Sequence, residues 1–160
     1  MPSPSMSTPP ARPILGASVA VFREGKVLLI QRARMPDLGS YSLPGGRIEV
    51  GETLREGALR ELDEETGLCA EIIGFIENAE FIQHDGAGNV RSHAVVAAFA
   101  GFWISGEARL SDEISDLVWV DPHAPGDLPM THGLPAILAK AAALVLGHDQ
   151  AAYGQPESAA

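Results

Sequence analysis

The chain has 160 residues, of which 46% are hydrophobic, and its formal net charge is −10. This length fits one domain with one core, and the acidic balance argues against general binding to nucleic acids or anionic membranes. The single cysteine excludes an internal disulfide, no Cys/His cluster has zinc-ligand spacing, and no apolar run is long enough to span a membrane, so we expect a protein of the reducing cytoplasm.

The first part of the chain predicts a tail followed by a β-hairpin. Residues 1–12 are rich in proline and serine and can bury little, so we expect a disordered tail ahead of a domain that spans 13–147. The runs 14–22 and 26–31 are rich in β-forming residues. The segment Arg23-Glu24-Gly25 between them is typical of a hairpin turn.

A helix is predicted to begin near residue 54 and to end before Gly67. Thr53 followed by Glu56 is a capping-box pattern, in which side-chain and backbone groups at the start of a helix satisfy one another. Gly67 stands where a left-handed cap ends a helix. Both ends of the helix are therefore indicated by the sequence alone.

Three carboxylates lie on one face of this predicted helix. Glu61, Glu64 and Glu65 stand at positions i, i+3 and i+4, which places them side by side. Their mutual repulsion destabilises the helix unless something offsets it. One interpretation is a solvated acidic surface. The other is a site for a hard divalent cation, namely Mg²⁺, which Mn²⁺ can replace.

Further strands and a second helix complete the expected α/β domain. Strands are expected at 70–76, 80–84, 92–104 and 116–120, with a glycine-rich turn at 85–89. A second helix is expected at 134–146 with Gly147 as its stop, and residues 148–160 are expected to form a disordered tail. Strands with two intervening helices predict a sheet that is covered by helices.

The most informative pattern in the chain spans residues 46–68. It reads Gly46, five residues, Glu52, seven residues, Arg60-Glu61-Leu62, any residue, Glu64-Glu65, any residue, Gly67-Leu68. This is a complete Nudix box, and the chain therefore resembles the Nudix hydrolases, most closely over 43–68 and more loosely over 14–146. The resemblance implies an α/β fold, namely a Nudix-type α/β/α sandwich with a mixed β-sheet.

The resemblance also suggests roles for the acidic residues. Gly45 matches the position whose carbonyl often binds the metal, and we expect Glu61 and Glu65 to be the principal metal ligands, with Glu64 as an additional ligand. The catalytic candidates are Glu61, Glu64 and Glu113. Glu113 lies in a late loop, where several family members place an extra carboxylate. The general base is either Glu61 or Glu113, and a plain surface turn is the alternative for Glu113.

Substrate-binding and supporting residues are expected around the same segment. Arg32 and Arg34 follow the second strand, where the family often places basic residues against phosphates, although exposed surface charges are the alternative. Tyr41 is a candidate to stack on a base, and core packing is its alternative. The residues expected to support the site structurally are Gly46, Glu52, Arg60 and Gly67, with Glu52 anchoring Arg60 across the loop.

The expected activity follows from these roles. The chain is similar to small ADP-ribose pyrophosphatase-like Nudix proteins, which implies Mg²⁺-dependent hydrolysis of a phosphoanhydride bond in a nucleoside diphosphate linked to another moiety. A housecleaning (deoxy)nucleoside triphosphate pyrophosphatase is the first alternative. A nucleotide-binding module without catalysis is the second. The expected partner is a nucleotide rather than a nucleic acid or a membrane, and the family resemblance makes a homodimer a candidate assembly.

Overall fold

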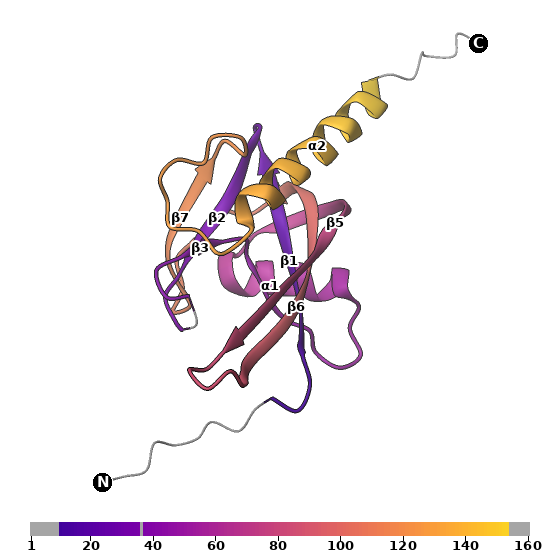
Figure 1. The fold of residues 1–160 in the computed structure, drawn as a ribbon. Coiled ribbons are helices and arrows are strands. Elements are labelled where there is room, and N and C mark those ends of the chain that lie inside the picture. Colours follow the sequence, from indigo (N-terminus) through magenta and orange to yellow (C-terminus); the bar gives the residue numbers. More distant parts are fainter. Residues whose placement is uncertain (1–9, 36, 154–160) are drawn as a thin grey trace, which may run out of the picture.

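The computed structural model describes residues 10–35 and 37–153 (Figure 1). The remainder of the two predicted tails, at 1–9 and 154–160, lies outside the described residues. The elements in chain order are β1 (Ile14–Arg23), β2 (Lys26–Arg32), β3 (Tyr41–Ser42), β4 (Gly45–Arg47), α1 (Leu54–Thr66), β5 (Cys69–His84), β6 (Val90–Ser105), β7 (Ile114–Val120) and α2 (Leu134–Tyr153).

The strands form one mixed sheet. Its main path runs β3-β2-β1-β6-β5, while β4 pairs with β1 and β7 pairs with β2. β1 and β6 are parallel, and the other pairs are antiparallel. β1 therefore lies at the centre of the sheet, where it pairs with β2, β4 and β6. This arrangement brings the glycine-rich β4 directly beside β1.

The two helices cover opposite faces of this sheet (Figure 1). Alternate residues of β1 point to opposite faces, as the pleat of a strand requires. Val19 and Val21 pack with Leu62 of α1, whereas Ala20 and Phe22 belong to the core that α2 covers. The predicted α/β/α sandwich is thus confirmed. Neither helix is both long and apolar enough to cross a membrane, within the part of the chain that is described.

Both ends of α1 agree with the sequence prediction. The Thr53 hydroxyl accepts from the Glu56 N–H at 3.1 Å, and the Glu56 carboxylate accepts from the Thr53 N–H at 3.0 Å. Gly67 has a φ of 80°, and its N–H donates to the Asp63 carbonyl. This left-handed position suits glycine because it lacks a Cβ atom. The two caps fix where α1 begins and ends, and the packing of Ala58 and Leu62 on the sheet sets which face turns toward it.

The middle of the sheet differs from the prediction in its strands. The two strands expected at 70–76 and 80–84 are one strand, β5, which stays paired with β6 through register shifts at Ile72/Gly74 and Phe75/Glu77. Such bulges interrupt the regular alternation of residues that marks a strand in a sequence. The short strands β3 and β4 were not predicted, because two or three residues carry no periodic pattern.

The second helix also continues beyond its predicted end. α2 runs to Tyr153, so the expected stop at Gly147 is wrong, as is the disorder expected from residue 148 to 153. Gly147 keeps a helical backbone rather than a left-handed one. A glycine inside a helix costs only about 1 kcal/mol relative to alanine, which does not end a helix by itself.

We predict that the core under α2 depends on Leu138. The Leu138 side chain is fully buried, whereas Leu146 on the same helix is 59% exposed. Leu138→Ala should lower the free energy of unfolding by about 2–5 kcal/mol, since it removes buried apolar contacts and leaves a cavity. Leu146→Ala is the matched control and should change it by no more than about 0.5 kcal/mol in urea titrations. Equal effects of the two substitutions would contradict this assignment of the core.

Candidate active site

Two glutamates of α1 lie against the glycines of β4. The Glu65 carboxylate accepts a hydrogen bond from the Gly45 N–H at 3.2 Å, and Glu65 is only 8% exposed. The Glu61 side chain is 15% exposed and lies beside Gly46. α1 packs on both β1 and β4, which holds these carboxylates at the sheet. The helix and the short strand together therefore place two acidic groups at one point.

The paired glycines are required by space rather than by unusual backbone angles. A Cβ atom on Gly46 would lie 2.4 Å from the Glu61 carboxyl carbon, and one on Gly45 would lie 2.4 Å from the Ala17 carbonyl oxygen. Neither glycine has a positive φ. Gly45 therefore lets β4 approach β1, and Gly46 leaves room for the Glu61 carboxylate.

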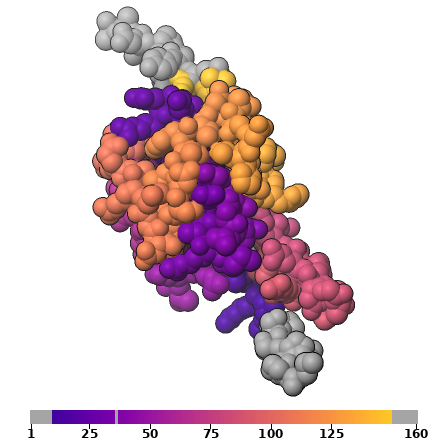
Figure 2. Space-filling model, turned by 90° about the vertical axis from the view of Figure 1, so that its left-hand side faces the viewer, coloured from indigo at the N-terminus to yellow at the C-terminus, as the bar shows by residue number. Residues whose placement is uncertain are grey.

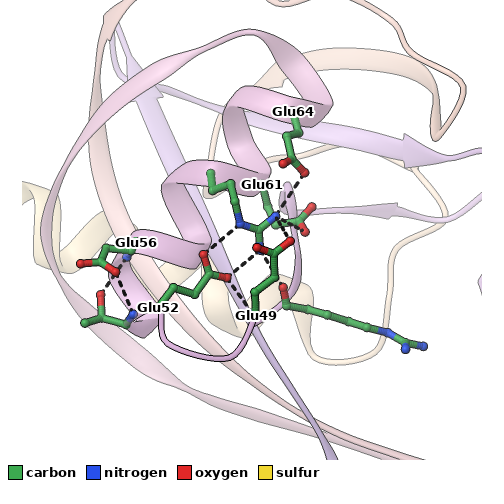
Figure 3. Close-up of polar contacts among 8 residues, drawn as sticks. Glu49, Glu52, Glu56, Glu61 and Glu64 are labelled. Carbon is green, nitrogen blue, oxygen red and sulfur yellow. Dashed lines mark hydrogen bonds and ion pairs between the residues drawn. The ribbon is translucent and has the colours of Figure 1, made fainter.

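Arg60 holds the acidic residues of this segment together (Figure 3). Its guanidinium donates to both oxygens of Glu52, at 2.7 and 2.9 Å, and to the Arg47 carbonyl at 2.9 Å. The same group contacts Glu61 at 3.0 Å and Glu64 at 3.1 Å. The expected anchoring of Arg60 by Glu52 is thus confirmed. Because Glu61 and Glu64 share one cation, Arg60 offsets part of the repulsion that the sequence predicted.

The surroundings of the carboxyl groups shift their pKa values in opposite directions. The hydrogen bonds from Arg60 lower the pKa of Glu52 to about 2. Burial raises the pKa of Glu65 to about 8, and only the Gly45 N–H and the charge of Arg32 oppose this rise. Burial also raises the pKa of Glu61, against the effect of Arg60. Glu65 is therefore a buried carboxyl group with little to compensate its negative charge.

Glu113 joins this site from a distant part of the chain. Its negative charge is one of the smaller causes of the raised pKa values of Glu61 and Glu65. The Glu113 carbonyl accepts from the Ala33 N–H at 2.9 Å, so the segment before β7 is tied to the end of β2. The Arg34 guanidinium lies 3.7 Å from the Glu113 carboxylate, and both side chains are more than half exposed. A role for Glu113 in the site stays a prediction.

Tyr41 has a structural position instead of the proposed stacking role. Its ring is 7% exposed in the core under α2, and its hydroxyl donates to the Asp116 carboxylate. This hydrogen bond raises the pKa of Tyr41. Its backbone pairs with Pro129 and Thr131, which fixes the segment leading into α2. A ring buried in this way cannot stack on a base, so packing is the correct alternative for Tyr41.

A cavity of about 400 Å³ opens beside the two glycines. Its walls come from the β2–β4 segment, from the β5–β6 hairpin and from the start of α2, which meet on the face shown in Figure 2. Arg32, Gly45 and Gly46 line one end of it, whereas Arg34 does not line it. The hairpin residues of this cavity were not singled out from the sequence. The only sequence signal was a run of small residues, such as Gly16 and Ser18, inside an apolar strand.

The acidic groups fit a hard divalent cation. The buried carboxyl group of Glu65 is offset in part by the Gly45 N–H and the charge of Arg32, and a bound cation would supply further positive charge. Glu61, the Gly45 carbonyl and the exposed Glu64 would add the oxygen ligands that Mg²⁺ prefers. In this conformation Arg60 occupies Glu61 and Glu64, and no three acidic, histidine or cysteine side chains of the described residues form a finished ligand set. Glu64, with a side chain 58% exposed, has room to change partner.

Comparisons with known proteins agree with this architecture. The NUDIX domain family matches residues 12–141. An ADP-ribose pyrophosphatase of Methanocaldococcus jannaschii is 30% identical over 109 residues, which cover 68% of this chain but only 62% of that protein. A Mycobacterium tuberculosis protein named for 8-oxo-dGTP diphosphatase activity is 34% identical over 128 residues, which cover 76% of this chain and 84% of that protein. The crystal structure of a MutT NUDIX hydrolase from Burkholderia pseudomallei matches with a TM-score of 0.70 at 29% identity, over 81% of this chain and 98% of that one.

We predict that Gly46→Ala weakens the binding of Mn²⁺, used as a spectroscopic substitute for Mg²⁺. The new methyl group would displace the Glu61 carboxylate, and changes next to a ligand typically lower metal affinity by about 10- to 100-fold. Gly86→Ala is the matched control, because a Cβ atom there meets nothing within 4 Å. Electron paramagnetic resonance of free Mn²⁺ measures both affinities, and an unchanged affinity in Gly46→Ala would remove Glu61 from the site.

The pair between Glu52 and Arg60 should make stability depend on pH. The pKa of Glu52 falls from 4.5 to about 2 in the folded chain, so the pair stabilises the fold above pH 4.5 and loses this effect as the pH falls toward 2. Wild-type protein should therefore exceed Glu52→Gln in unfolding free energy near neutral pH, and the difference should shrink between about pH 5 and pH 2. Urea titrations over this range provide the measurement. A difference that stays constant with pH would argue against the pair.

Proposed function

This chain belongs to the Nudix family, and we propose that it hydrolyses a phosphoanhydride bond in a nucleoside diphosphate linked to a second moiety, with ADP-ribose as the first candidate. The observation that carries the proposal is the buried Glu65 beside Glu61, both of which lie against the two glycines that line the end of a cavity large enough for a nucleotide. A buried carboxyl group with a raised pKa next to an open cavity is an arrangement typical of a functional site rather than of a solvated surface.

The residues divide into those that hold the cation and those that handle the substrate. Glu61, Glu65 and the Gly45 carbonyl would hold Mg²⁺, with Glu64 as an additional ligand. The chemistry that Mg²⁺ supplies when bound is polarisation of the anhydride and neutralisation of charge on the leaving phosphate. Arg32, which lines the cavity next to the glycines, orients the phosphates by its positive charge.

The hydrolysis needs one water molecule and one proton acceptor. The water oxygen forms a bond to phosphorus, the bridging P–O bond breaks, and the two products are a nucleoside monophosphate and the phosphorylated second moiety. Either Glu113 or Glu61 accepts the proton of the water. Glu113 has the more exposed side chain and is not bound to Arg60, so we favour it as the base.

A second substrate class is supported by one of the similarities. The relative named for 8-oxo-dGTP diphosphatase activity aligns with more of this chain than the archaeal ADP-ribose pyrophosphatase does, at 76% against 68%. A housecleaning nucleoside triphosphate pyrophosphatase is therefore the second candidate. A binding module without catalysis fits less well, because every carboxylate of the box is present. The lone Cys69, which is exposed, is consistent with our proposal of a reducing cytoplasmic location.

We predict that Glu65→Gln stays folded but loses at least about 100-fold in kcat with Mg²⁺, because it removes a charge that holds the cation against the developing phosphate charge. Glu56→Gln is the matched control on the same helix, since glutamine also completes a capping box. Phosphate release coupled to an added phosphatase reports turnover of both variants. Near-normal turnover in Glu65→Gln would refute the proposed site.

The substrate is identified by a panel of nucleotides with Mg²⁺. ADP-ribose, other nucleotide sugars and dinucleotides yield monoesters, from which an added phosphatase releases phosphate. Nucleoside triphosphates yield pyrophosphate, which an added inorganic pyrophosphatase detects instead. We expect the highest kcat/KM for ADP-ribose. A higher kcat/KM for 8-oxo-dGTP would move the protein to the second class, and binding without any product would make it a sensor.

A further inference from the structure

The cavity extends from the candidate active site to a patch of the β5–β6 hairpin. Alternate residues of the two strands face it, as the pleat requires. On β5 these are Ala79, Phe81 and Gln83, and on β6 they are Ser92, Ala94, Val96 and Ala98. Most of them are small. The cavity exists because these positions, together with Gly16 and Ser18 of β1, carry little side-chain volume.

Phe81 and Gln83 are the two large side chains on this floor. Phe81 pairs with Ala94 on the neighbouring strand, so no large cross-strand side chain covers the half-buried ring on the cavity side. Gln83 pairs with Ser92, and the Ser92 hydroxyl donates to the Gln83 carbonyl oxygen at 3.2 Å. This hydrogen bond does not use the amide N–H groups of Gln83. An aromatic face and a hydrogen-bonding amide thus lie next to each other.

The register of the sheet gives the distance from this patch to the carboxylates. Ser18 pairs with Gly45 on one side and with Ala98 on the other, so Ala98 lies level with the candidate active site. Ala94, opposite Phe81, is four residues further along β6. Four residues of strand span about 13 Å along the strands, and the three strand spacings from β4 to β5 add about 14 Å across them. This interval has room for a ribose and a diphosphate between the Phe81 ring and the Gly45 end of the cavity.

We propose that Phe81 and Gln83 form a nucleobase site, in which the base stacks on the Phe81 ring and the Gln83 amide hydrogen-bonds to its edge. The proposal rests on the proposed function, because the phosphates must lie at the Gly45 end. A ligand group that both stacks on the Phe81 ring and hydrogen-bonds to the Gln83 amide is planar and aromatic, with polar atoms at its edge. The substrate is therefore a nucleoside diphosphate derivative, and diphosphates without a base, such as sugar or isoprenoid diphosphates, lack the group that this end of the cavity binds.

Binding of AMP and of ribose 5-phosphate, measured by calorimetry, tests this site. The two ligands differ only in the base, so wild-type protein should bind AMP more tightly. Phe81→Ala should weaken AMP binding at least about fivefold, the lower end of what stacking on one base contributes, and should leave ribose 5-phosphate unchanged. Gln83→Ala should weaken AMP binding by about three- to tenfold. Phe81→Leu keeps an apolar side chain without the ring and should also lose affinity for AMP if the alanine variant does not fold.

Ile82→Ala is the matched control. Ile82 lies between the two residues on the same strand, points to the other face of the sheet and is 48% exposed. Equal binding of the two ligands by wild-type protein would overturn the proposal, as would equal loss in the Phe81 and Ile82 variants. These outcomes are independent of turnover. Failure of every substrate to be hydrolysed, with selective loss of AMP binding in Phe81→Ala, would refute the proposed reaction and retain the nucleobase site.

Discussion

The guanidinium of Arg60 is the contact on which the rest of the site depends. It joins α1 to the segment before it through Glu52 and the Arg47 carbonyl, and it also lies between Glu61 and Glu64. An arginine suits this position because its planar group donates several hydrogen bonds in fixed directions. Without such a cation, the glutamates on the acidic face of α1 would repel one another, and the preceding loop would lose its attachment to the helix.

Arg60 also separates two kinds of carboxylate within one short segment. Glu52 is paired with it and has a lowered pKa, whereas Glu65 lies beyond its reach, is buried and has a raised pKa. Glu52 stabilises the loop, whereas the charge of an ionised Glu65 is offset only in part by the Gly45 N–H and Arg32. Two residues of the same chemical type thus differ in function because their surroundings differ. The proposed cation site would therefore lie next to the Glu52–Arg60 ion pair, which supports the loop before α1.

The sequence predicted those features that depend on residues close together in the chain. The caps of α1 and the pair of Glu52 with Arg60 join residues no more than eight positions apart, and each was expected correctly. The length of α2 and the continuity of β5 depend on packing between distant segments, and sequence patterns did not reveal them. For Tyr41 the sequence left stacking and packing open, and the fold decides for packing. The sequence identified Gly45 and Gly46 as site residues, but it did not give the reason for glycine at these positions. Only the fold shows which atoms approach them.

The same difference between local and distant contacts explains how one motif can accompany different substrates. The carboxylates of the box and Arg60 lie within one segment of the chain. The candidate metal site can therefore stay the same in any chain that keeps this segment. The far end of the cavity is formed by β5 and β6, whose facing positions can change without disturbing α1. Relatives at 30% and 34% identity are accordingly named for different nucleotides. If the base lies at the Phe81 and Gln83 end of the cavity, as proposed, substrate choice in this chain should be sought on the hairpin rather than in the box.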